Sequence, residues 1–343
     1  MSKFKFSVGP WNVAEGADVY GPEVRRTIPF EKKVEEFKKL GFDAVQFHDD
    51  DAVPELNGKT AAQIAAKAKE VKKLLDHTGM AAEFVAPRLW MDPHCIDGAY
   101  TSNSAADRKY AIERSLKSID IARELGTDKI VLWLAREGTS CAESKDPVTA
   151  IKHLVEAVNA MLAYDKTIKI LIEPKPNEPV DRSYCGTIGH VMGVSAATSD
   201  PARVGGLLES AHAVLAGLDP ANEIAFGLAM GKLWGVHLND QNGLKFDQDR
   251  SFGAENLRQA FNQVKVLVEH GYGAHGEYIG LDVKAMRTTS DEAGYQHLTT
   301  SLNVFKILED KARSFDQAFQ RKCVAERNYE ALELYVLTHL MKG

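Results

Sequence analysis

The sequence contains little cysteine, and its cysteines are scattered. Among 343 residues there are 4 cysteines and no C-x-x-C motif, and the positions are Cys95, Cys141, Cys185 and Cys323. This spacing argues against a disulfide framework and against a structural zinc site built from thiolates. We therefore expect free thiols in a reducing compartment.

Long hydrophobic runs are also missing. The strongest apolar run covers residues 130–135, far fewer than the roughly 20 residues that a membrane-spanning helix needs. The first residues, MSKFKFSVG, lack the apolar core of a signal peptide. These absences predict a cytoplasmic protein that does not enter a membrane.

Positive charge is not in excess. The chain has 42 Lys and Arg against 48 Asp and Glu, a formal net charge of −6 and a pI of about 6.0. Without a basic surface to neutralise phosphates, we expect neither nucleic acid nor an anionic membrane as a partner. Hydrophobic residues at 44% and charged residues at 26% are ordinary for a globular enzyme.

Short apolar runs alternate with amphipathic helical patterns. The runs are typical of buried strands, and they lie at residues 4–8, 42–47, 81–86, 129–133, 169–173, 203–208, 234–238 and 278–282. Helical spacing is clearest at residues 60–75, 107–125, 146–163 and 254–270. Strands that are apolar throughout indicate a parallel sheet buried on both faces. We predict an α/β fold, a closed (β/α)8 TIM barrel, with an open doubly wound sheet as the alternative.

The end of the chain follows a different pattern. Residues 313–343 predict helix without a further strand. We therefore expect a catalytic barrel domain over residues 1–312 and a short C-terminal helical extension over residues 313–343. We expect this extension to pack on a neighbouring subunit, in a homo-oligomer that is a dimer or a tetramer.

Acidic and imidazole side chains stand at or after four successive strands of this pattern. In a (β/α)8 barrel the carboxyl ends of the strands meet at one face, which carries the active site. Carboxylates gathered there repel one another unless cations or protons neutralise them. Oxygen-rich sites with one or two imidazoles suit Mg²⁺ or Mn²⁺, and also Co²⁺. The side chains in question are Glu173, Glu209, His212, His237, Asp247, Asp249 and Asp282.

The spacing within this set is compatible with a second metal site. Glu209-x-x-His212 places two side chains on one side of a helical turn. Asp247-x-Asp249 needs a loop or an extended segment to aim both carboxylates the same way. The two pairs together can form a metal site that shares Glu209 with the first.

Longer motifs around these positions resemble one known family. IEPKPNEP at 172–179, FHDDD at 47–51 and NGLKFDQD at 242–249 are similar to motifs of the xylose isomerase (glucose isomerase) family, in particular its short class. LWLAREG and LDVKAMRT match in the same order, and the resemblance covers about residues 4–315. It implies a divalent-metal-dependent enzyme that interconverts an aldose and a ketose, xylose/xylulose-like or glucose/fructose-like. The implied reaction is a metal-assisted hydride shift between C1 and C2.

The resemblance implies ligands for two divalent metal ions. Those of the first, structural ion are Glu173, Glu209 and Asp282. Those of the second, catalytic ion are Glu209, His212, Asp247 and Asp249.

Other matched positions imply roles toward the sugar. Lys175 would donate a hydrogen bond to the carbonyl oxygen of the substrate and stabilise negative charge there. His48, oriented by Asp51, would help to open the sugar ring. Trp11 and Trp133 would form apolar walls that keep water away from the reacting carbons.

Three positions depart from the family pattern. His237 stands where the family has an aspartate ligand, which removes one negative charge and favours Mn²⁺ or Co²⁺ over Mg²⁺ if His237 is a ligand. Arg88 lies in a loop that replaces the family's asparagine-containing loop, and Trp90 stands where the family has phenylalanine. We expect both side chains to bind substrate and to alter the choice of sugar.

Other functions stay open from the sequence alone. A single-metal sugar epimerase on the same barrel would move a proton through an enediolate, and its carboxylate–carboxylate–His–carboxylate ligand order is similar to Glu173, Glu209, His237 and Asp282. A metal lyase or deglycosidase would cleave a modified sugar rather than rearrange it. A non-catalytic sugar-binding protein would have little use for two ion sites.

Overall fold

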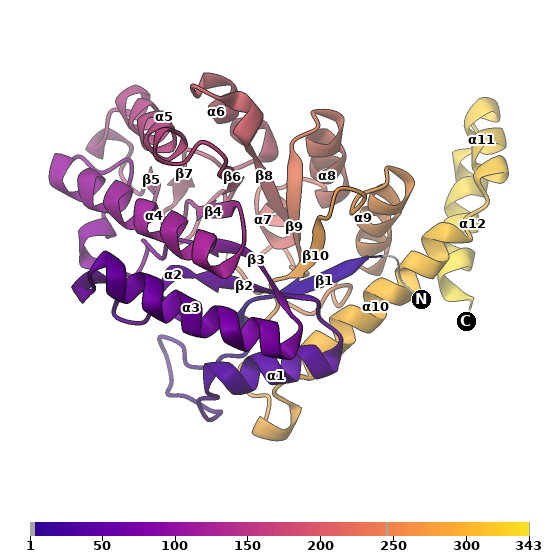
Figure 1. Ribbon diagram of the computed structural model, residues 1–343. Helices are drawn as coiled ribbons and strands as arrows, with labels where there is room; N and C mark the ends of the chain where they lie inside the picture. Colours follow the sequence, from indigo (N-terminus) through magenta and orange to yellow (C-terminus); the bar gives the residue numbers. More distant parts are fainter. Residues whose placement is uncertain (1–3, 245, 343) are drawn as a thin grey trace.

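Eight parallel strands form a closed barrel inside a ring of helices (Figure 1). This computed structural model describes residues 4–244 and 246–342. The barrel strands are β1 (Lys5–Val8), β2 (Ala44–His48), β3 (Ala81–Ala86), β4 (Lys129–Trp133), β6 (Lys169–Glu173), β8 (Val204–Glu209), β9 (Leu233–Leu238) and β10 (Tyr278–Leu281). Their order around the barrel is β1-β10-β9-β8-β6-β4-β3-β2.

Closure of the barrel confirms the predicted fold class and excludes the open sheet. β1 pairs in parallel with β10, in a register that joins Lys5 to Tyr278 and Val8 to Leu281. Each of the eight predicted runs overlaps one barrel strand. The strands are buried almost throughout because the barrel interior takes one face and the helices cover the other.

A second, two-stranded sheet has no counterpart in the sequence prediction. β5 (Gly138–Thr139) pairs antiparallel with β7 (Arg182–Ser183). These strands follow β4 and β6, so they tie together two loops at the carboxyl end of the barrel. Strands of two residues are too short to leave a period in the sequence.

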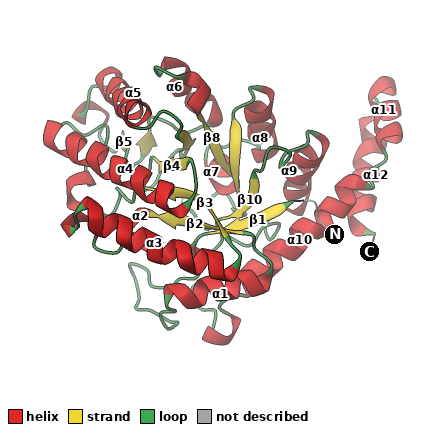
Figure 2. Ribbon diagram, in the orientation of Figure 1, coloured by secondary structure: helices red, strands yellow, loops and turns green. Residues whose placement is uncertain are grey.

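The helices begin where the sequence offers side-chain caps. Thr60, Ser104 and Asp146 each accept a backbone hydrogen bond in the first turn of the helix that follows. Figure 2 shows the helices around the strands. Their bounds are α1 (Phe30–Leu40), α2 (Asp49–Ala52), α3 (Ala61–Thr78), α4 (Ala105–Leu125), α5 (Pro147–Tyr164), α6 (Ile188–Ala197), α7 (Ser210–Leu215), α8 (Pro220–Ala229), α9 (Leu257–Glu269), α10 (Gln296–Arg313), α11 (Gln317–Glu326) and α12 (Tyr329–Met341). Of these described helices, none is both long and apolar enough to span a membrane.

Apolar side chains form a floor inside the barrel. Phe84, Val131, Leu171 and Leu207 come from four strands and make a buried cluster. Phe84 and Val131 also line the cavity at the carboxyl ends of the strands. The polar residues at the strand ends therefore stand above a packed core rather than above an open pore.

The C-terminal extension consists of α11 and α12, which lie to one side of the barrel beside α9 and α10 (Figure 1). Arg258 of α9 donates a hydrogen bond of 2.9 Å to Glu333 of α12. Leu334, Leu337 and Met341 of α12 are exposed. Contact of this extension with a neighbouring subunit stays a prediction.

A buried ion pair joins α4 to the end of β2. Arg114 donates to both carboxylate oxygens of Asp49, at 2.8 Å and 2.9 Å. Ser118 and the backbone N–H of Arg88 also donate to Asp49. This carboxylate therefore anchors α4, α2 and the loop after β3 to one another, next to His48.

We expect the substitution Arg114→Met to destabilise the fold strongly. It leaves the Asp49 carboxylate buried without its cation, which costs about 3–5 kcal/mol of unfolding free energy. Arg258→Met is the matched control, because its pair with Glu333 lies on the surface and is worth at most about 1 kcal/mol. Urea unfolding monitored by circular dichroism measures both losses. Equal losses in the two variants would contradict the anchoring role of Arg114.

Candidate metal centre and active site

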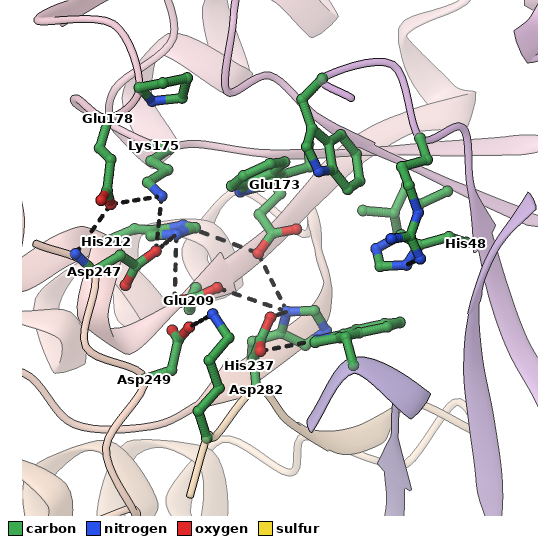
Figure 3. Close-up of a pocket in the computed structure, with 18 of the residues that line it drawn as sticks. His48, Glu173, Lys175, Glu178, Glu209, His212, His237, Asp247, Asp249 and Asp282 are labelled. Carbon is green, nitrogen blue, oxygen red and sulfur yellow. Dashed lines mark hydrogen bonds and ion pairs between the residues drawn. The ribbon is translucent and has the colours of Figure 1, made fainter. Parts of the chain in front are cut away.

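A cavity of about 350 Å³ lies at the carboxyl ends of the barrel strands. Figure 3 shows the labelled side chains converging on it from several strands. Of the residues that the sequence assigns to the site, all but Asp51 line this cavity. Asp51 lies behind His48, with its carboxylate 3.1 Å from the ring. Topology therefore brings together residues spread over more than two hundred positions.

The first group of candidate metal ligands surrounds His237. Its Nδ1 lies 3.2 Å from Glu173 Oε1, 3.7 Å from Asp282 Oδ2 and 3.9 Å from Glu209 Oε2. One donor atom from each of the four residues falls within 4.8 Å of every other. Three carboxylates and one imidazole can therefore face a single cation.

Gly280 makes room for this arrangement. It pairs with His237 in the register of β10 and β9. A Cβ at Gly280 would lie 2.9 Å from His237 Cδ2 and 2.5 Å from Gln46 Nε2. A larger residue at this position would therefore clash with the imidazole and its neighbours.

The second group shares Glu209 with the first. His212 Nε2 lies 3.2 Å from Glu209 Oε1 and 3.0 Å from Asp247 Oδ2. These three residues form another set of donor atoms within 4.8 Å of one another. The helical spacing of Glu209 and His212 across the start of α7 has the effect that the sequence predicts. Lys245, within the motif at 242–249, lies outside the described residues.

Asp249 lies beside the second group but is engaged elsewhere. It forms an ion pair with Lys284 and accepts a hydrogen bond of 3.1 Å from Asn239. Its backbone has a φ of 46°, in the left-handed region that residues other than glycine rarely adopt. In this arrangement Asp249 does not complete the ligand set that the resemblance implies.

Burial and mutual repulsion distribute the charges of the site unevenly. Burial, reinforced by the neighbouring Asp247 and Asp282 carboxylates, raises the pKa of Glu209 well above its ordinary value. Burial alone lowers the pKa of His237, but the Glu173 carboxylate outweighs it and raises this pKa to about 9. In the same way His237 overcomes burial and lowers the pKa of Glu173 to about 2. A cation bound beside Glu209 would oppose this shift and favour the charged carboxylate.

The donor atoms themselves fit divalent cations. Asp247 Oδ1 is buried and, among the described residues, has no hydrogen-bond partner. Buried carboxylate oxygens are ordinarily satisfied, so this atom points to a missing positive partner. Oxygen donors with one imidazole in each group match the preferences of Mg²⁺, Mn²⁺ and Co²⁺.

Lys175 reaches the same cavity from the segment after β6. Its ammonium lies 2.8 Å from Asp247, 3.3 Å from Glu178 and 4.8 Å from the centre of the Trp133 ring. Burial lowers the pKa of Lys175, but Asp247 outweighs it and the pKa rises above its usual value. A permanent positive donor therefore stands next to the second group.

Aromatic rings also line the cavity. Trp90 packs edge-on against Trp133 with centroids 4.5 Å apart, and His48 lies 5.1 Å from Trp90 and 4.3 Å from Trp11. Trp11 also donates its indole N–H to Asp282 at 2.9 Å. The aromatic group therefore also contacts one carboxylate of the first group, that of Asp282.

Comparisons with known proteins decide the family. A family model described as xylose isomerase-like TIM barrel matches residues 34–310. The chain belongs to this family. Among curated proteins, the xylose isomerase of Thermus thermophilus is 33% identical over 316 residues, which are 91% of this chain and 80% of that protein. The resemblance read from the motifs is confirmed, and the protein is an enzyme of the xylose isomerase-like superfamily, which holds isomerases and epimerases.

Solved structures agree on the fold. A 3-keto-D-glucoside 4-epimerase from E. coli superimposes with a TM-score of 0.64 at 14% identity, covering 88% of this chain and 100% of that one. An L-ribulose 3-epimerase gives a TM-score of 0.64 at 13% identity, covering 90% and 96%. At these identities the likeness shows the xylose isomerase-like barrel and nothing finer.

Besides Glu178, two residues at the site of this xylose isomerase-like barrel escape the sequence assignment. Asn239 donates to Glu209 at 2.8 Å and to Asp249 at 3.1 Å, and it accepts the N–H of Ala211 at 2.8 Å. Lys284 pairs with Asp249. Both follow a strand directly or closely, which is the signal that marked the acidic residues, but neither side chain is a carboxylate or an imidazole.

Proposed function

We propose that this protein is a divalent-metal-dependent aldose–ketose isomerase, acting on a xylose/xylulose-like or glucose/fructose-like sugar by a hydride shift between C1 and C2. The observation that carries the proposal is the pair of ligand groups sharing Glu209, with the Lys175 ammonium beside them. The curated relative that is 33% identical over most of the chain supports the same reaction.

The proposal assigns each group one metal ion, Mg²⁺, Mn²⁺ or Co²⁺. The residues that would hold the first ion are Glu173, Glu209, His237 and Asp282. Those for the second are Glu209, His212 and Asp247, with Asp249 joining them if it leaves Lys284. Cations bound there would polarise two adjacent oxygens of the sugar.

The protein's own side chains supply the rest of the chemistry. Lys175 donates to the carbonyl oxygen at which negative charge develops, and its contacts with Glu178 and Trp133 hold the ammonium at the cavity. Trp11, Trp90 and Trp133 cover the reacting carbons and keep water from exchanging with the migrating hydrogen.

Turnover in deuterated water tests this proposal. The enzyme, loaded with Mn²⁺ and given the aldose or ketose that a screen identifies, is expected to yield product without solvent deuterium at C1 or C2. A hydride that moves directly between carbons never meets the solvent, so mass spectrometry of the product reads the mechanism. Solvent deuterium in the product at one atom per turnover would contradict the hydride shift.

A single-metal epimerase is the second candidate, and one observation favours it. With His237, the first group consists of three carboxylates and an imidazole, while Asp249 pairs with Lys284 rather than with the second group. One ion and a carboxylate base would then move a proton through an enediolate. This candidate predicts deuterium in the product and inversion at a single carbon, so the same experiment separates the two reactions.

A further inference from the structure

The imidazole of His48 stands between two groups of opposite charge. Arg88 Nη2 lies 2.6 Å from Nδ1 of the ring, and Asp51 Oδ2 lies 3.1 Å from the same nitrogen. The family resemblance implies only the contact with Asp51. Arg88 is a departure from the family pattern, so the second contact is a property of this sequence.

The short contact determines where the proton of His48 sits. A guanidinium has five donors and no acceptor. At 2.6 Å its N–H must therefore meet a lone pair on Nδ1, and Nδ1 carries no proton. Both carboxylate oxygens of Asp51 have other donors, so neither depends on a proton at Nδ1 of His48. Oδ2 accepts the backbone N–H of His48 at 2.9 Å, and Oδ1 accepts from Arg88 at 3.1 Å.

Arg88 is itself held on several sides. Its Nε lies 2.8 Å from Asp50 Oδ1, and its backbone N–H donates to Asp49 at 3.2 Å. Asp50 and Asp51 thus both pair with the guanidinium. Arg88 is therefore placed to orient His48. Its charge is already paired, so it is not a free cation that would bind an acidic group on the substrate.

We propose that Arg88 is a positioning residue that holds His48 as the neutral tautomer with its proton on Nε2, so that His48 donates a hydrogen bond to the substrate and takes no proton from it. The ring plane is fixed between Trp11 and Trp90. Among the residues that the structure describes, no protein group accepts from Nε2, and the ring lines the cavity. The partner of Nε2 is thus an acceptor oxygen of the ligand, such as a carbonyl.

This tautomer bears on the class of substrate, a step that rests on the proposed function. Opening a hemiacetal ring requires a base that takes the hydroxyl proton. His48 has one nitrogen occupied by Arg88 and the other by a proton, so it is no such base. The proposal therefore favours a sugar that presents a free carbonyl, as an open-chain aldose or ketose does. Under this proposal His48 does not have the ring-opening role that the resemblance implies.

The tautomer can be observed directly by NMR of the full chain labelled with ¹⁵N-histidine. The chain has 11 histidines, and the signals missing from the His48→Gln variant belong to His48. We expect an unprotonated Nδ1 and a protonated Nε2 at neutral pH. In Arg88→Met the proton is expected to move to Nδ1, toward Asp51, whereas Arg136→Met, which removes a contact with the backbone of Trp90, leaves the His48 signals unchanged. A wild-type His48 with its proton on Nδ1, or with both nitrogens protonated, overturns the proposal even if Arg88→Met does not fold.

Activity gives an independent readout. Glutamine can donate but cannot act as a base, so His48→Gln is expected to keep turnover within about tenfold, while His48→Leu loses about 10²-fold with the donor. Equal loss in both variants would mean that His48 takes up a proton and would overturn the proposal. If the wild-type enzyme turns over no sugar at all, the proposed function fails, and the tautomer is still decided by the NMR spectrum.

Discussion

Replacing Glu209 by glutamine is expected to abolish tight binding of divalent ions at both ligand groups and to lower turnover by about 10³-fold or more, since bound ions contribute several kcal/mol to the transition state. Glu209 is the residue that the groups share, with Oε1 facing His212 and Oε2 facing His237. Glutamine keeps the shape and removes only the charge. Calorimetric titration with Mn²⁺ counts the ions lost.

Asp247→Asn is the matched control for Glu209→Gln. Asp247 belongs to the second group alone, so this variant should lose one ion and keep the other. Metal-free Glu209→Gln should unfold at no lower temperature than the metal-free wild type, because burial and neighbouring carboxylates oppose the charge of Glu209. Its thermal shift on adding Mn²⁺ should vanish. If Glu209→Gln still binds two ions, or if Glu209→Gln and Asp247→Asn lose the same number of ions, Glu209 is not a shared ligand.

The sequence predicted the barrel and the neighbourhood of the site for a topological reason. Apolar runs mark parallel strands, and all parallel strands of a barrel deliver their carboxyl ends to one face. Glu173 and Glu209 are the last residues of β6 and β8, and Asp282 directly follows β10. Their convergence does not depend on loop conformation, which explains why the strand pattern alone is enough to group these widely separated carboxylates.

Features set by loops were beyond the sequence patterns. The left-handed backbone of Asp249 and its ion pair with Lys284 depend on how the segment after β9 folds back over the barrel. The contact of Arg88 with His48 likewise depends on the loop after β3. No periodicity describes such segments, so the sequence could name the residues but not their partners.

A different test concerns Lys175, for which a structural role and a chemical role make opposite predictions. The ammonium is buried, pairs with Asp247 and Glu178, and lies over Trp133. Methionine has a similar length and can keep the contact with the indole, so Lys175→Met removes mainly the charge. If the charge serves to stabilise a developing oxyanion, kcat should fall by about 10²–10³-fold, the loss typical of one such donor.

Metal binding separates the two roles of Lys175. Because its ammonium competes with a cation for Asp247, Lys175→Met should bind Mn²⁺ at the second group as tightly as the wild type or more tightly. Lys175→Arg, which keeps the charge in a different geometry, should recover only part of the rate. Calorimetry and steady-state kinetics on the same preparations give both quantities. If Lys175→Met loses both Mn²⁺ binding and activity, Lys175 is a structural partner of Asp247. If kcat is unchanged, Lys175 takes no part in the chemistry. A donor to the substrate requires a low kcat with intact metal binding.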